Sequence, residues 1–384
     1  MREVCVLGVG QVPVQELWDK SLRELAVASI VAALEDAGQP AVEALYVGNM
    51  LGGELTGQAH LGALVADFAG LAGIEALRVE AAGASGGLAF RLGYLAVASG
   101  VHDIVLVTGV EKMTERLDPE VTAALALAHD GDFEMFPGAT PAALAAMIMQ
   151  RYIHEYGVAR GDFAIFPLTS HQNAVHNPYA MYRKALTREF YDKAEMTAAP
   201  LNILDCSPTC DGAASVVLAP AQVARDLGRP VVRVSGSGVA TDTIAVHDRA
   251  DPLWLAAAAR SAALAYQQAG KDPAEIDFFE LYDDFSITAA LALEACGFAA
   301  RGQGVRFAHE AGIGLDGRLP ICTMGGLKGR GNPDGATGVY QIVDVVNQLR
   351  GTAGANQLDC RVGMAQAIGG SGATVVTHIL EVEK

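Results

Sequence analysis

The sequence contains one large internal duplication, and this feature limits the possible folds more than any other. In each half a short apolar strand is followed by an alanine-rich helix that ends on a glycine, and then by a second strand. The first copy spans 4–10, 21–38 and 44–49, and the second spans 231–238, 253–270 and 277–282. A glycine at such a helix end favours a left-handed C-terminal cap. Strands that alternate with helices indicate mixed or parallel sheets covered on both faces. We therefore predict an α/β fold of two similar halves.

The duplication continues along the chain and is interrupted once. A helix bracketed by Gly87 and Gly100 is matched, with the same spacing, by one bracketed by Gly338 and Gly351. The intervening residues 112–204 do not repeat, and their Met, Tyr, His, Asn and Pro content predicts a helical and loop insertion that supplies specificity or a lid. The predicted organisation is an N-terminal half (1–111 plus 205–222), an inserted loop domain (112–204) and a C-terminal half (223–384).

Composition excludes several classes of protein. With 51% hydrophobic and 18% charged residues among 384, the chain can bury one large core or two smaller ones. Charges interrupt the apolar runs before they reach the roughly 18 to 20 residues of a membrane span. The first residues, MREVCVLGVG, lead directly into a strand rather than a signal peptide. A net charge of −17 without a basic run opposes nucleic-acid binding. We expect a cytoplasmic protein that binds neither nucleic acid nor membrane.

The six cysteines are scattered, and we expect them to be reduced because a chain of this length needs no disulfides. Cys206 and Cys210 have a CxxxC spacing, but no second Cys or His pair with zinc-like spacing lies nearby in the sequence, so we predict no metal site. Cys322 is interpreted as a core residue, because free cysteine behaves as a small hydrophobe.

Seven stretches, in chain order, share a pattern of glycine-rich loops and short motifs. They are VEAAGASGG (79–87), HQNAVHNP (171–178), LDCSPTCDGAASVVL (204–218), GSGVATDTIAVHDR (236–249), ELYDDFSI (280–287), DGRLPICTMGGLKGRGNPDGATG (316–338) and AIGGSGATVVTHIL (367–380). Together they resemble the thiolase superfamily, specifically its archaeal-type and sterol-carrier-protein-type branch of acyl-CoA thiolases. The resemblance implies a thiolase-like five-layer αβαβα sandwich of two duplicated halves. It also implies a coenzyme A thioester as substrate with no covalently bound cofactor, a homodimer or homotetramer, and a zinc-ribbon/OB-fold partner protein.

The chemistry of a thiolase is incomplete in this chain. A thiolase needs a thiolate at a helix N-terminus, a histidine that activates it, and a further acid or base with oxyanion holes. By the resemblance, the nucleophile falls on Gly83, which has no side chain to acylate, and the histidine of the GHP motif is replaced by Asn332. The HDCF motif reads YDDF at 282–285, and the last glycine-rich loop has Met364 and Gln366 nearby. Because these positions depart together, we predict that the cysteine-dependent ping-pong route is lost.

A retro-aldol cleavage of a β-hydroxyacyl-CoA needs no acyl-enzyme, only a base and donors for the thioester enolate. We predict chemistry of this type, with Asp284 as base, Tyr282 as proton donor or enolate stabiliser, and Asn332 as oxyanion donor. Thiolase-like aldolases of steroid side-chain degradation also lack the cysteine and carry a tyrosine in a Y-D-x-F motif. Asp284 fits a helix N-cap equally well, and Tyr282 a packed residue. Two other functions stay open: a non-catalytic acyl-CoA-binding subunit, and an ordinary acetyl-CoA acyltransferase with a replaced nucleophile.

The resemblance also implies contacts to coenzyme A. It assigns the pantetheine to a segment at the start of the second half, for which a plain tight turn is the alternative. In the insertion we predict ligand-facing polar residues, although a lone histidine is more often structural. The predicted binding residues are Ser235, Gly236, Ser237, Gly238, His171, Asn173 and Gly370.

Overall fold

The computed structural model describes residues 2–383, and in this range nine strands form one mixed sheet in the order β3-β2-β4-β7-β1-β8-β11-β10-β9. Strands β1 and β8 join the two halves of the sheet through two antiparallel pairs, Cys5 with Arg233 and Val6 with Val232. The strands are β1 (Val4–Gln11), β2 (Ala44–Gly48), β3 (Glu75–Val79), β4 (Val105–Glu111), β7 (Gly212–Pro220), β8 (Val232–Thr241), β9 (Phe278–Glu280), β10 (Val362–Gly369) and β11 (Thr374–Val382).

The two halves of the sheet have matching topology. In the N-terminal half β2 is parallel to β4, and β4, β7 and β1 then follow in antiparallel order. In the C-terminal half β9 is parallel to β10, and β10, β11 and β8 then follow in antiparallel order. The duplication predicted from the sequence is therefore confirmed for four strands of each half, and β3 is an additional strand at the edge of the N-terminal half.

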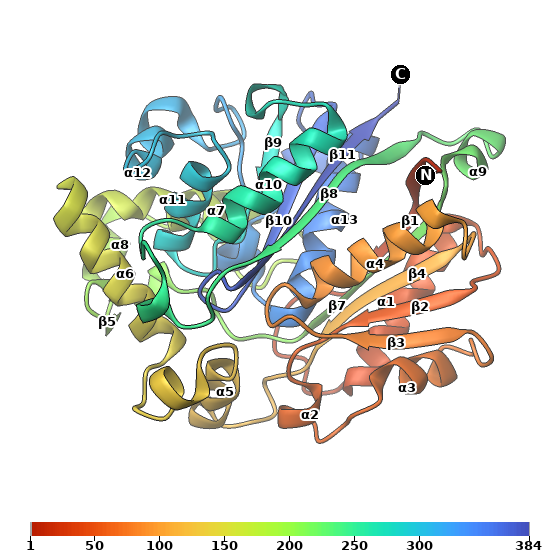
Figure 1. Cartoon of the computed structure of the whole chain (residues 1–384), viewed down its shortest axis with the longest axis horizontal. Coiled ribbons are helices and arrows are strands. Elements are labelled where there is room, and N and C mark those ends of the chain that lie inside the picture. Colours follow the sequence, from red (N-terminus) through yellow and green to blue (C-terminus); the bar gives the residue numbers. More distant parts are fainter. Residues whose placement is uncertain (1, 384) are drawn as a thin grey trace.

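Helices form three layers around these half-sheets (Figure 1). Helices α4 (Ser85–Ser99) and α13 (Thr337–Arg350) pack against each other and contact strands of both halves, so they make the middle layer. A Cβ atom on Gly338 would collide with the backbone nitrogen of Gly87, so glycine permits this close approach. The outer faces are covered by α1 (Leu22–Ala37) and α3 (Leu61–Phe68) on one side and α10 (Ala256–Ala269) on the other. The predicted five-layer αβαβα sandwich is confirmed.

The helix ends marked by glycine in the sequence are helix ends in the structure. Helix α1 begins after the N-cap Ser21, whose side chain takes part in a capping box, and ends at Gly38 with a left-handed φ of +83°. Its counterpart α10 ends at Gly270 with φ of +65°. The two middle helices end in the same way at Gly100 and Gly351. The sequence thus encodes these boundaries locally.

The predicted insertion forms a cluster of helices to one side of both halves (yellow to light green in Figure 1). Its elements are α5 (Asp118–Ala126), α6 (Pro141–Tyr156), α7 (Ile165–Ala174), α8 (Arg188–Lys193), β5 (Met196–Ala198) and β6 (Leu201–Asn202). Its first residues are tied down where Lys112 Nζ and Thr114 Oγ1 donate to Asp211 Oδ2 at 2.7 and 2.6 Å. Helix α11 (Ser286–Ala295) of the C-terminal half packs on α6 and α7. The domain boundaries at 111/112 and 204/205 stay a prediction.

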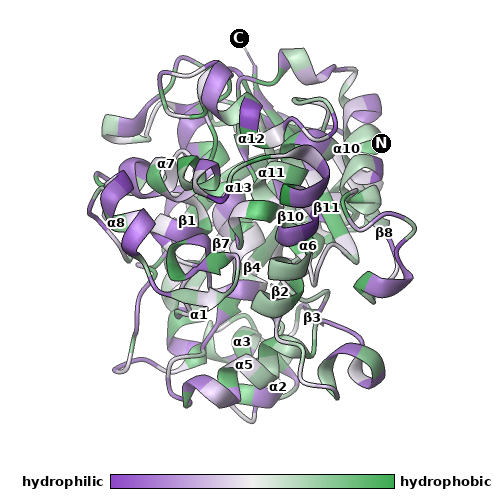
Figure 2. Ribbon diagram, turned by 90° about the vertical axis from the view of Figure 1, so that its left-hand side faces the viewer, coloured by the Kyte–Doolittle hydropathy of each residue, from purple (hydrophilic) through white to green (hydrophobic). Residues whose placement is uncertain are grey.

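Hydrophobic residues concentrate in strands such as β7 and β10, whereas the outlying α8 is mostly hydrophilic (Figure 2). Three short helices complete the set: α2 (Gly52–Leu55), α9 (Ala221–Asp226) and α12 (Gly304–Phe307). Between residues 2 and 383, no helix combines the length and the apolar character that crossing a membrane requires.

Candidate active site

Gly83 lies in the loop between β3 and α4, at the junction of the two halves. Ala82 is left-handed with φ of +50°. Ser85 Oγ accepts a hydrogen bond from the Ala81 N–H at 2.9 Å and donates to the Ala82 carbonyl at 2.5 Å, which holds the turn ahead of the helix. A Cβ atom on Gly83 would lie only 2.6 Å from the carbonyl oxygen of Ile368, at the end of β10. The predicted nucleophile position is thus buried between the first half and the second.

Tyr282 fills the space beside Gly83. A Cβ atom on Gly83 would collide with the Tyr282 hydroxyl oxygen and would lie 2.9 Å from its Cζ. Tyr282 follows β9, and only 3% of it is exposed. A side chain at position 83 and Tyr282 in this orientation therefore exclude each other. A phenol occupies the junction to which the resemblance assigns a thiol.

Asp334 is the hydrogen-bond partner of Tyr282, and it was not predicted from the sequence. Tyr282 Oη donates to Asp334 Oδ1 at 3.3 Å, whereas Asp334 Oδ2 is buried with no partner among residues 2–383. Asp334 precedes α13 with φ of +26°, in a region that side-chain-bearing residues seldom adopt. The available signal was a carboxylate directly after Gly331-Asn332-Pro333, in the most specific of the glycine-rich loops.

Burial sets the protonation of this pair. It raises the pKa of Asp334 to about 6, although the hydrogen bond from Tyr282 acts in the opposite direction. Burial, followed by the charges of Asp334 and Asp284, raises the pKa of Tyr282 well above its usual range. Near neutral pH the pair is therefore a phenol hydrogen-bonded to a mostly ionised carboxylate, and Tyr282 is a proton donor rather than a base.

A second buried carboxyl group, Glu111 at the end of β4, lies close to the loop that carries Asp334. Its oxygens accept hydrogen bonds from the backbone N–H groups of Met50 (2.8 Å) and Leu51 (3.0 Å) and from Asn49 Nδ2 (2.7 Å). Burial, and then the charge of Asp334, raise the pKa of Glu111 to about 8, although the N–H donors oppose this shift. Because its donors all come from the turn after β2, Glu111 anchors that turn.

Asn332 is oriented by two hydroxyl groups. Its Nδ2 donates to Ser207 Oγ at 3.1 Å, and its Oδ1 accepts from Thr337 Oγ1 at 2.7 Å. Interaction with this amide also lowers the pKa of Tyr282, which brings Asn332 and Tyr282 into one site. An amide nitrogen has two hydrogens, so one remains after the hydrogen bond to Ser207.

Asp284 lies two residues after Tyr282 and lines a cavity of about 50 Å³ together with His129, Gly370 and Ser371. The cavity thus joins Asp284 to the predicted Gly370. Burial raises the pKa of Asp284 to about 7, opposed by hydrogen bonds to its carboxylate. A carboxyl group with this pKa is suited to act as a base near neutral pH.

The alternative interpretation of Asp284 as a helix N-cap is wrong in detail. The N-cap of α11 is Phe285, and no side chain makes a capping hydrogen bond to that helix. Asp284 Oδ1 instead accepts from the backbone N–H of Phe285 at 2.7 Å, one residue before the helix. Its carboxylate also interacts with the hydroxyl of Thr288 in the first turn.

No cysteine offers a replacement thiolate. All six are free, and Cys322 is fully buried in the core. Burial raises the pKa of every thiol: to about 11 for Cys5 and Cys206, to about 12 for Cys296 and Cys360, and well above the usual range for Cys210 and Cys322. Because the thiolate is the attacking form, these thiols are poor nucleophiles. Within residues 2–383, no three His, Cys, Asp or Glu side chains are grouped to hold a metal ion.

A larger cavity of about 1070 Å³ lies between the insertion and the loop that carries Ser207. Ser207 holds Asn332, so this cavity adjoins the site. His171 lies in its wall and stacks on Tyr182, with ring centroids 5.6 Å apart. Burial lowers the pKa of His171 to about 4, so the imidazole is neutral. His171 thus lies in the wall of a cavity, and its contact with a ligand stays a prediction.

The segment 235–238 lies inside strand β8 and not in a loop. The prediction that it contacts pantetheine is therefore corrected, and so is the alternative prediction of a tight turn. A Cβ atom on Gly236 or Gly238 would collide with the backbone of α10, so both glycines let the helix pack closely on the strand. Ser235 Oγ donates to a carbonyl of β11 at 3.1 Å, and the Ser237 N–H donates to a side chain of α10 at 3.1 Å. These residues serve packing.

Asn173 requires a similar correction. It is 2% exposed, and its Nδ2 donates to the carbonyl oxygens of Ile321 and Cys322, both at 3.1 Å. Its own carbonyl accepts from Asn356 Nδ2 at 2.6 Å. With its polar groups used in this way, Asn173 fixes the segment ahead of the glycine-rich loop and does not face a ligand.

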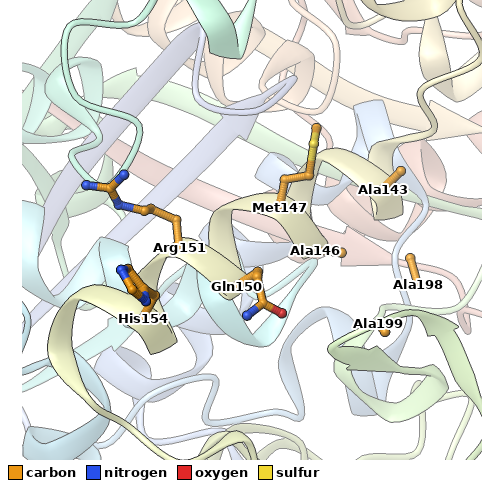
Figure 3. Close-up of a pocket in the computed structure, with 8 residues that line it drawn as sticks. All are labelled: Ala143, Ala146, Met147, Gln150, Arg151, His154, Ala198 and Ala199. Carbon is orange, nitrogen blue, oxygen red and sulfur yellow. The ribbon is translucent and has the colours of Figure 1, made fainter.

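A groove of about 560 Å³ runs along α6 (Figure 3). Met147, Gln150, Arg151 and His154 extend from the helix, and Ala198 and Ala199 form the opposite wall at β5. It contains none of the residues of the site at the junction.

Comparison with known proteins identifies the family and agrees with the fold. Residues 5–222 match the family described as thiolase, N-terminal domain, and residues 238–382 match the family described as thiolase C-terminal domain-like. The chain belongs to the thiolase family. It is 45% identical to a protein of Methanothermobacter thermautotrophicus named acetyl-CoA acetyltransferase, over 99% of each chain.

Two other relatives of this thiolase-family chain are named for bond cleavage. One is 17-hydroxy-3-oxo-4-pregnene-20-carboxyl-CoA lyase of Mycobacterium tuberculosis, 30% identical over 91% of this chain and 92% of the relative. The other is a solved structure named Ltp2-ChsH2(DUF35) aldolase, with a TM-score of 0.86, 25% identity, and coverage of 100% of this chain and 98% of that one. The family therefore includes proteins named as acyltransferases and proteins named as lyases or aldolases.

Proposed function

We propose that this protein makes or breaks a carbon–carbon bond beside a coenzyme A thioester without an acyl-enzyme, by retro-aldol cleavage of a β-hydroxyacyl-CoA or the reverse. The observation that carries the proposal is that the Tyr282 hydroxyl fills the space a side chain on Gly83 would need. A nucleophilic thiol has no room there, whereas a buried phenol beside a carboxylate can supply a proton. The names of the lyase and aldolase relatives support this reaction class.

In the cleavage direction, Asp284 takes the proton of the β-hydroxyl group. The O–H electron pair forms the carbonyl bond of the leaving aldehyde or ketone, and the Cα–Cβ pair moves onto the thioester as an enolate. Asn332 donates an N–H to the enolate oxygen, as in other oxyanion holes. Tyr282 protonates the α-carbon, which yields the shortened acyl-CoA. The proton gained by Asp284 returns to Tyr282 through solvent, which balances the cycle.

Asp334 is proposed as the residue that positions Tyr282. One of its oxygens accepts the phenol hydrogen bond, and the other has no partner among residues 2–383. The left-handed backbone of Asp334 aims its carboxylate from the start of α13 toward Tyr282 on the strand side. It is expected to hold the phenol in place, and its charge raises the pKa of Tyr282, which keeps the phenol protonated until the enolate takes the proton.

We propose that coenzyme A occupies the larger cavity. Lys328 lies in its wall, 1% exposed, with Nζ donating to the backbone carbonyls of Asp205 and Asp284. Arg183 and Lys184 are exposed along the same wall. The two exposed cationic side chains suit the phosphates of coenzyme A, even in a chain whose net charge is −17.

The proposed assembly is a homodimer or homotetramer with a zinc-ribbon/OB-fold partner. The name of the solved aldolase structure pairs Ltp2 with ChsH2(DUF35), which supports the search for a complex. Light scattering on the protein purified from its native host measures the oligomeric state. Zinc analysis of any co-purifying chain tests for the partner.

The proposed reaction is tested with β-hydroxyacyl-CoAs of several chain lengths, using the chain alone and together with any protein that co-purifies. Mass spectrometry should detect a shortened acyl-CoA and an aldehyde or ketone. Exchange of the α-protons of acetyl-CoA in D₂O, followed by NMR, tests enolate formation by itself. Tyr282→Phe should slow both processes, and Asp284→Ala should slow the cleavage, whose β-hydroxyl proton Asp284 takes. Unchanged cleavage rates in both variants would remove the assignment of these residues.

A second candidate is a non-catalytic acyl-CoA-binding subunit. The cavity of about 1070 Å³ favours it, because that space can hold a large ligand whether or not the junction is active. Calorimetric binding of coenzyme A without turnover of any thioester would support this function.

The third function, an ordinary acetyl-CoA acyltransferase, is supported by the name of the 45% identical relative. Acyl-enzyme trapping decides it, and the absence of an adduct on any cysteine would end it.

A further inference from the structure

We propose that the cavity beside Asp284 holds the carbonyl fragment that leaves in the cleavage, and that it selects a short aldehyde or ketone. This inference rests on the proposed function. The cavity measures about 50 Å³. A water-sized group needs about 10–15 Å³ of such space, so the cavity holds about three to five non-hydrogen atoms. The substrate class would then be β-hydroxyacyl-CoAs with a small group on the β-carbon.

One end of the cavity is apolar. Ile148 of α6, Leu255 ahead of α10 and Leu291 of α11 line it, and all three side chains are buried. They come from the insertion and from the C-terminal half, so the pocket depends on how α6 packs against α11. Walls of this kind exclude water and take the alkyl part of a ligand.

The other end is polar and contains an unsatisfied imidazole. His129 Nε2 and Ser371 Oγ are 3.0 Å apart, and His129 Nδ1 has no partner among residues 2–383, although the residue is only 7% exposed. Buried polar atoms in native proteins are nearly always hydrogen-bonded, so Nδ1, near the backbone carbonyl of Ala126, is a candidate donor to a ligand in the cavity. Burial lowers the pKa of His129, against the nearby Glu134, so the imidazole is neutral. With Ser371 donating to Nε2, Nδ1 carries the proton and can donate it in a hydrogen bond to a carbonyl oxygen.

The cavity is connected to the junction at Gly83 through the segment that follows β10. The carbonyl of Ile368 lies against Gly83, and Gly370 and Ser371 follow it in the same loop. A Cβ atom on Gly370 would lie 2.5 Å from the Ala128 carbonyl, so this loop packs closely on the residue before His129. A substrate with its thioester beside Tyr282 would therefore direct its β-hydroxyl group to Asp284 and its alkyl group into the cavity.

This arrangement gives His129 a defined part in the reaction. Asp284 takes the hydroxyl proton while the Cα–Cβ bond breaks, and the oxygen becomes the carbonyl oxygen of the leaving fragment. His129 Nδ1–H donates a hydrogen bond to that oxygen throughout, and no proton is transferred from His129. The neutral imidazole thus stabilises the partial negative charge on oxygen during bond cleavage.

The size limit is tested with 3-hydroxybutyryl-CoA, 3-hydroxyhexanoyl-CoA and 3-hydroxydecanoyl-CoA, measuring kcat/KM by acetyl-CoA release. We expect 3-hydroxybutyryl-CoA and 3-hydroxyhexanoyl-CoA, whose leaving fragments fit the cavity, to be preferred by about tenfold or more over 3-hydroxydecanoyl-CoA, since each misplaced methylene costs about that factor. Leu291→Ala should shift the preference toward the longer chains by a similar factor. Leu25→Ala, which removes an equally buried leucine from the outer helix α1, is the matched control and should leave the preference unchanged.

The polar end is tested at His129. His129→Ala should lower kcat for 3-hydroxybutyryl-CoA by about tenfold or more, and His129→Asn, which keeps a donor near Nδ1, should recover much of the loss. Equal cleavage of all three lengths by the wild type and Leu291→Ala would overturn the pocket but leave the proposed function. An acyl adduct trapped on Ser371 would also overturn it, because the His129–Ser371 pair would then act as a nucleophile. Absence of cleavage of every substrate, together with no α-proton exchange, would overturn the proposed function itself.

Discussion

The N-terminal ends of α4 and α13 occupy equivalent places in the two halves and have nearly the same sequence. AGASG at 82–86 leads into α4, and DGATG at 334–338 leads into α13, and the helix begins at the fourth residue of each pentapeptide. The first residue of each is left-handed, with φ of +50° for Ala82 and +26° for Asp334. The duplication thus extends to the backbone of two loops that come together in the middle layer.

The two loops differ in the polar group that lies against the glycine. A Cβ atom on Gly83 would meet the Tyr282 hydroxyl, and one on Gly335 would lie 2.7 Å from Glu111 Oε2. Glu111 is enclosed by the N–H donors of the turn at 49–51. Tyr282 makes only a 3.3 Å bond to Asp334, and Asp284, two residues further along, lines an open cavity. On the proposed function, the same backbone conformation therefore serves chemistry at α4 and stability at α13.

The largest expected effect comes from replacing Tyr282 and Glu111, one at a time. Tyr282→Phe should lower kcat/KM by about 10²- to 10⁴-fold, because it removes the proton donor. It should cost about 1 kcal/mol of stability, because it removes one long hydrogen bond. Glu111→Gln should show the opposite pattern, with a stability loss of about 1–3 kcal/mol, since an amide NH₂ would face backbone N–H donors. Steady-state kinetics and urea denaturation of both variants measure the two patterns, and similar activity losses in both would show that the loops do not differ in role.

The glycines themselves offer a second test. Gly83→Ala should destabilise the protein by about 1–3 kcal/mol through overpacking, and Gly335→Ala by at least as much, because its Cβ would lie 2.6 Å from the backbone nitrogen of Met50. Adding Tyr282→Leu should recover part of the loss in Gly83→Ala and none in Gly335→Ala. Thermal and denaturant melts measure the four variants. A Gly83→Ala protein with wild-type stability would mean that Tyr282 does not fill the space beside it.

Titration of Asp284 gives the third test. Its folded pKa is raised from 3.8 to about 7. As a base it acts when ionised, so kcat/KM should rise about tenfold per pH unit up to about pH 7 and then level off. Because the folded pKa is raised, this group stabilises the protein most at low pH, and the stability falls by up to about 1.4 kcal/mol per unit between about pH 4 and 7.

Asp284→Asn should flatten the rate dependence in that window and make the stability dependence less steep, while Asp334 and Glu111 keep contributing to the stability dependence. The folded pKa of Glu111 is raised to about 8, so its contribution to stability should fall as the pH rises to that value. The pH profile of kcat/KM should show no corresponding step. An unchanged rate profile in Asp284→Asn would show that another group is the base.

The fold was readable from the sequence because its signals are local and repeated. Glycine caps, alternating strands and helices, and the spacing of the second copy each specify one element, and together they predicted the layers. The prediction of a binding loop at 235–238 was wrong because the sequence does not distinguish a glycine packed under α10 from a glycine in a loop.

The site was only partly readable because its contacts join distant segments. Motif comparison located Gly83, Tyr282, Asp284 and Asn332 separately, yet the collision between Gly83 and Tyr282 is a property of three-dimensional packing. His129 and Ser371 are 242 residues apart and belong to segments that a motif search treats independently. Their pairing depends on the insertion folding over the last glycine-rich loop.

The smallest expected difference concerns Ser85 and Thr337, the hydroxyl residues at the fourth position of the two pentapeptides. Ser85 Oγ bonds only the backbone of its own turn, whereas Thr337 Oγ1 donates to the Asn332 side chain at 2.7 Å. Ser85→Ala and Thr337→Val should each cost about 1 kcal/mol of stability. Thr337→Val should in addition lower kcat a few-fold with little change in KM, because the amide of Asn332 is no longer oriented. A larger kcat loss in Ser85→Ala would assign the oxyanion donors to the backbone at α4 instead of Asn332.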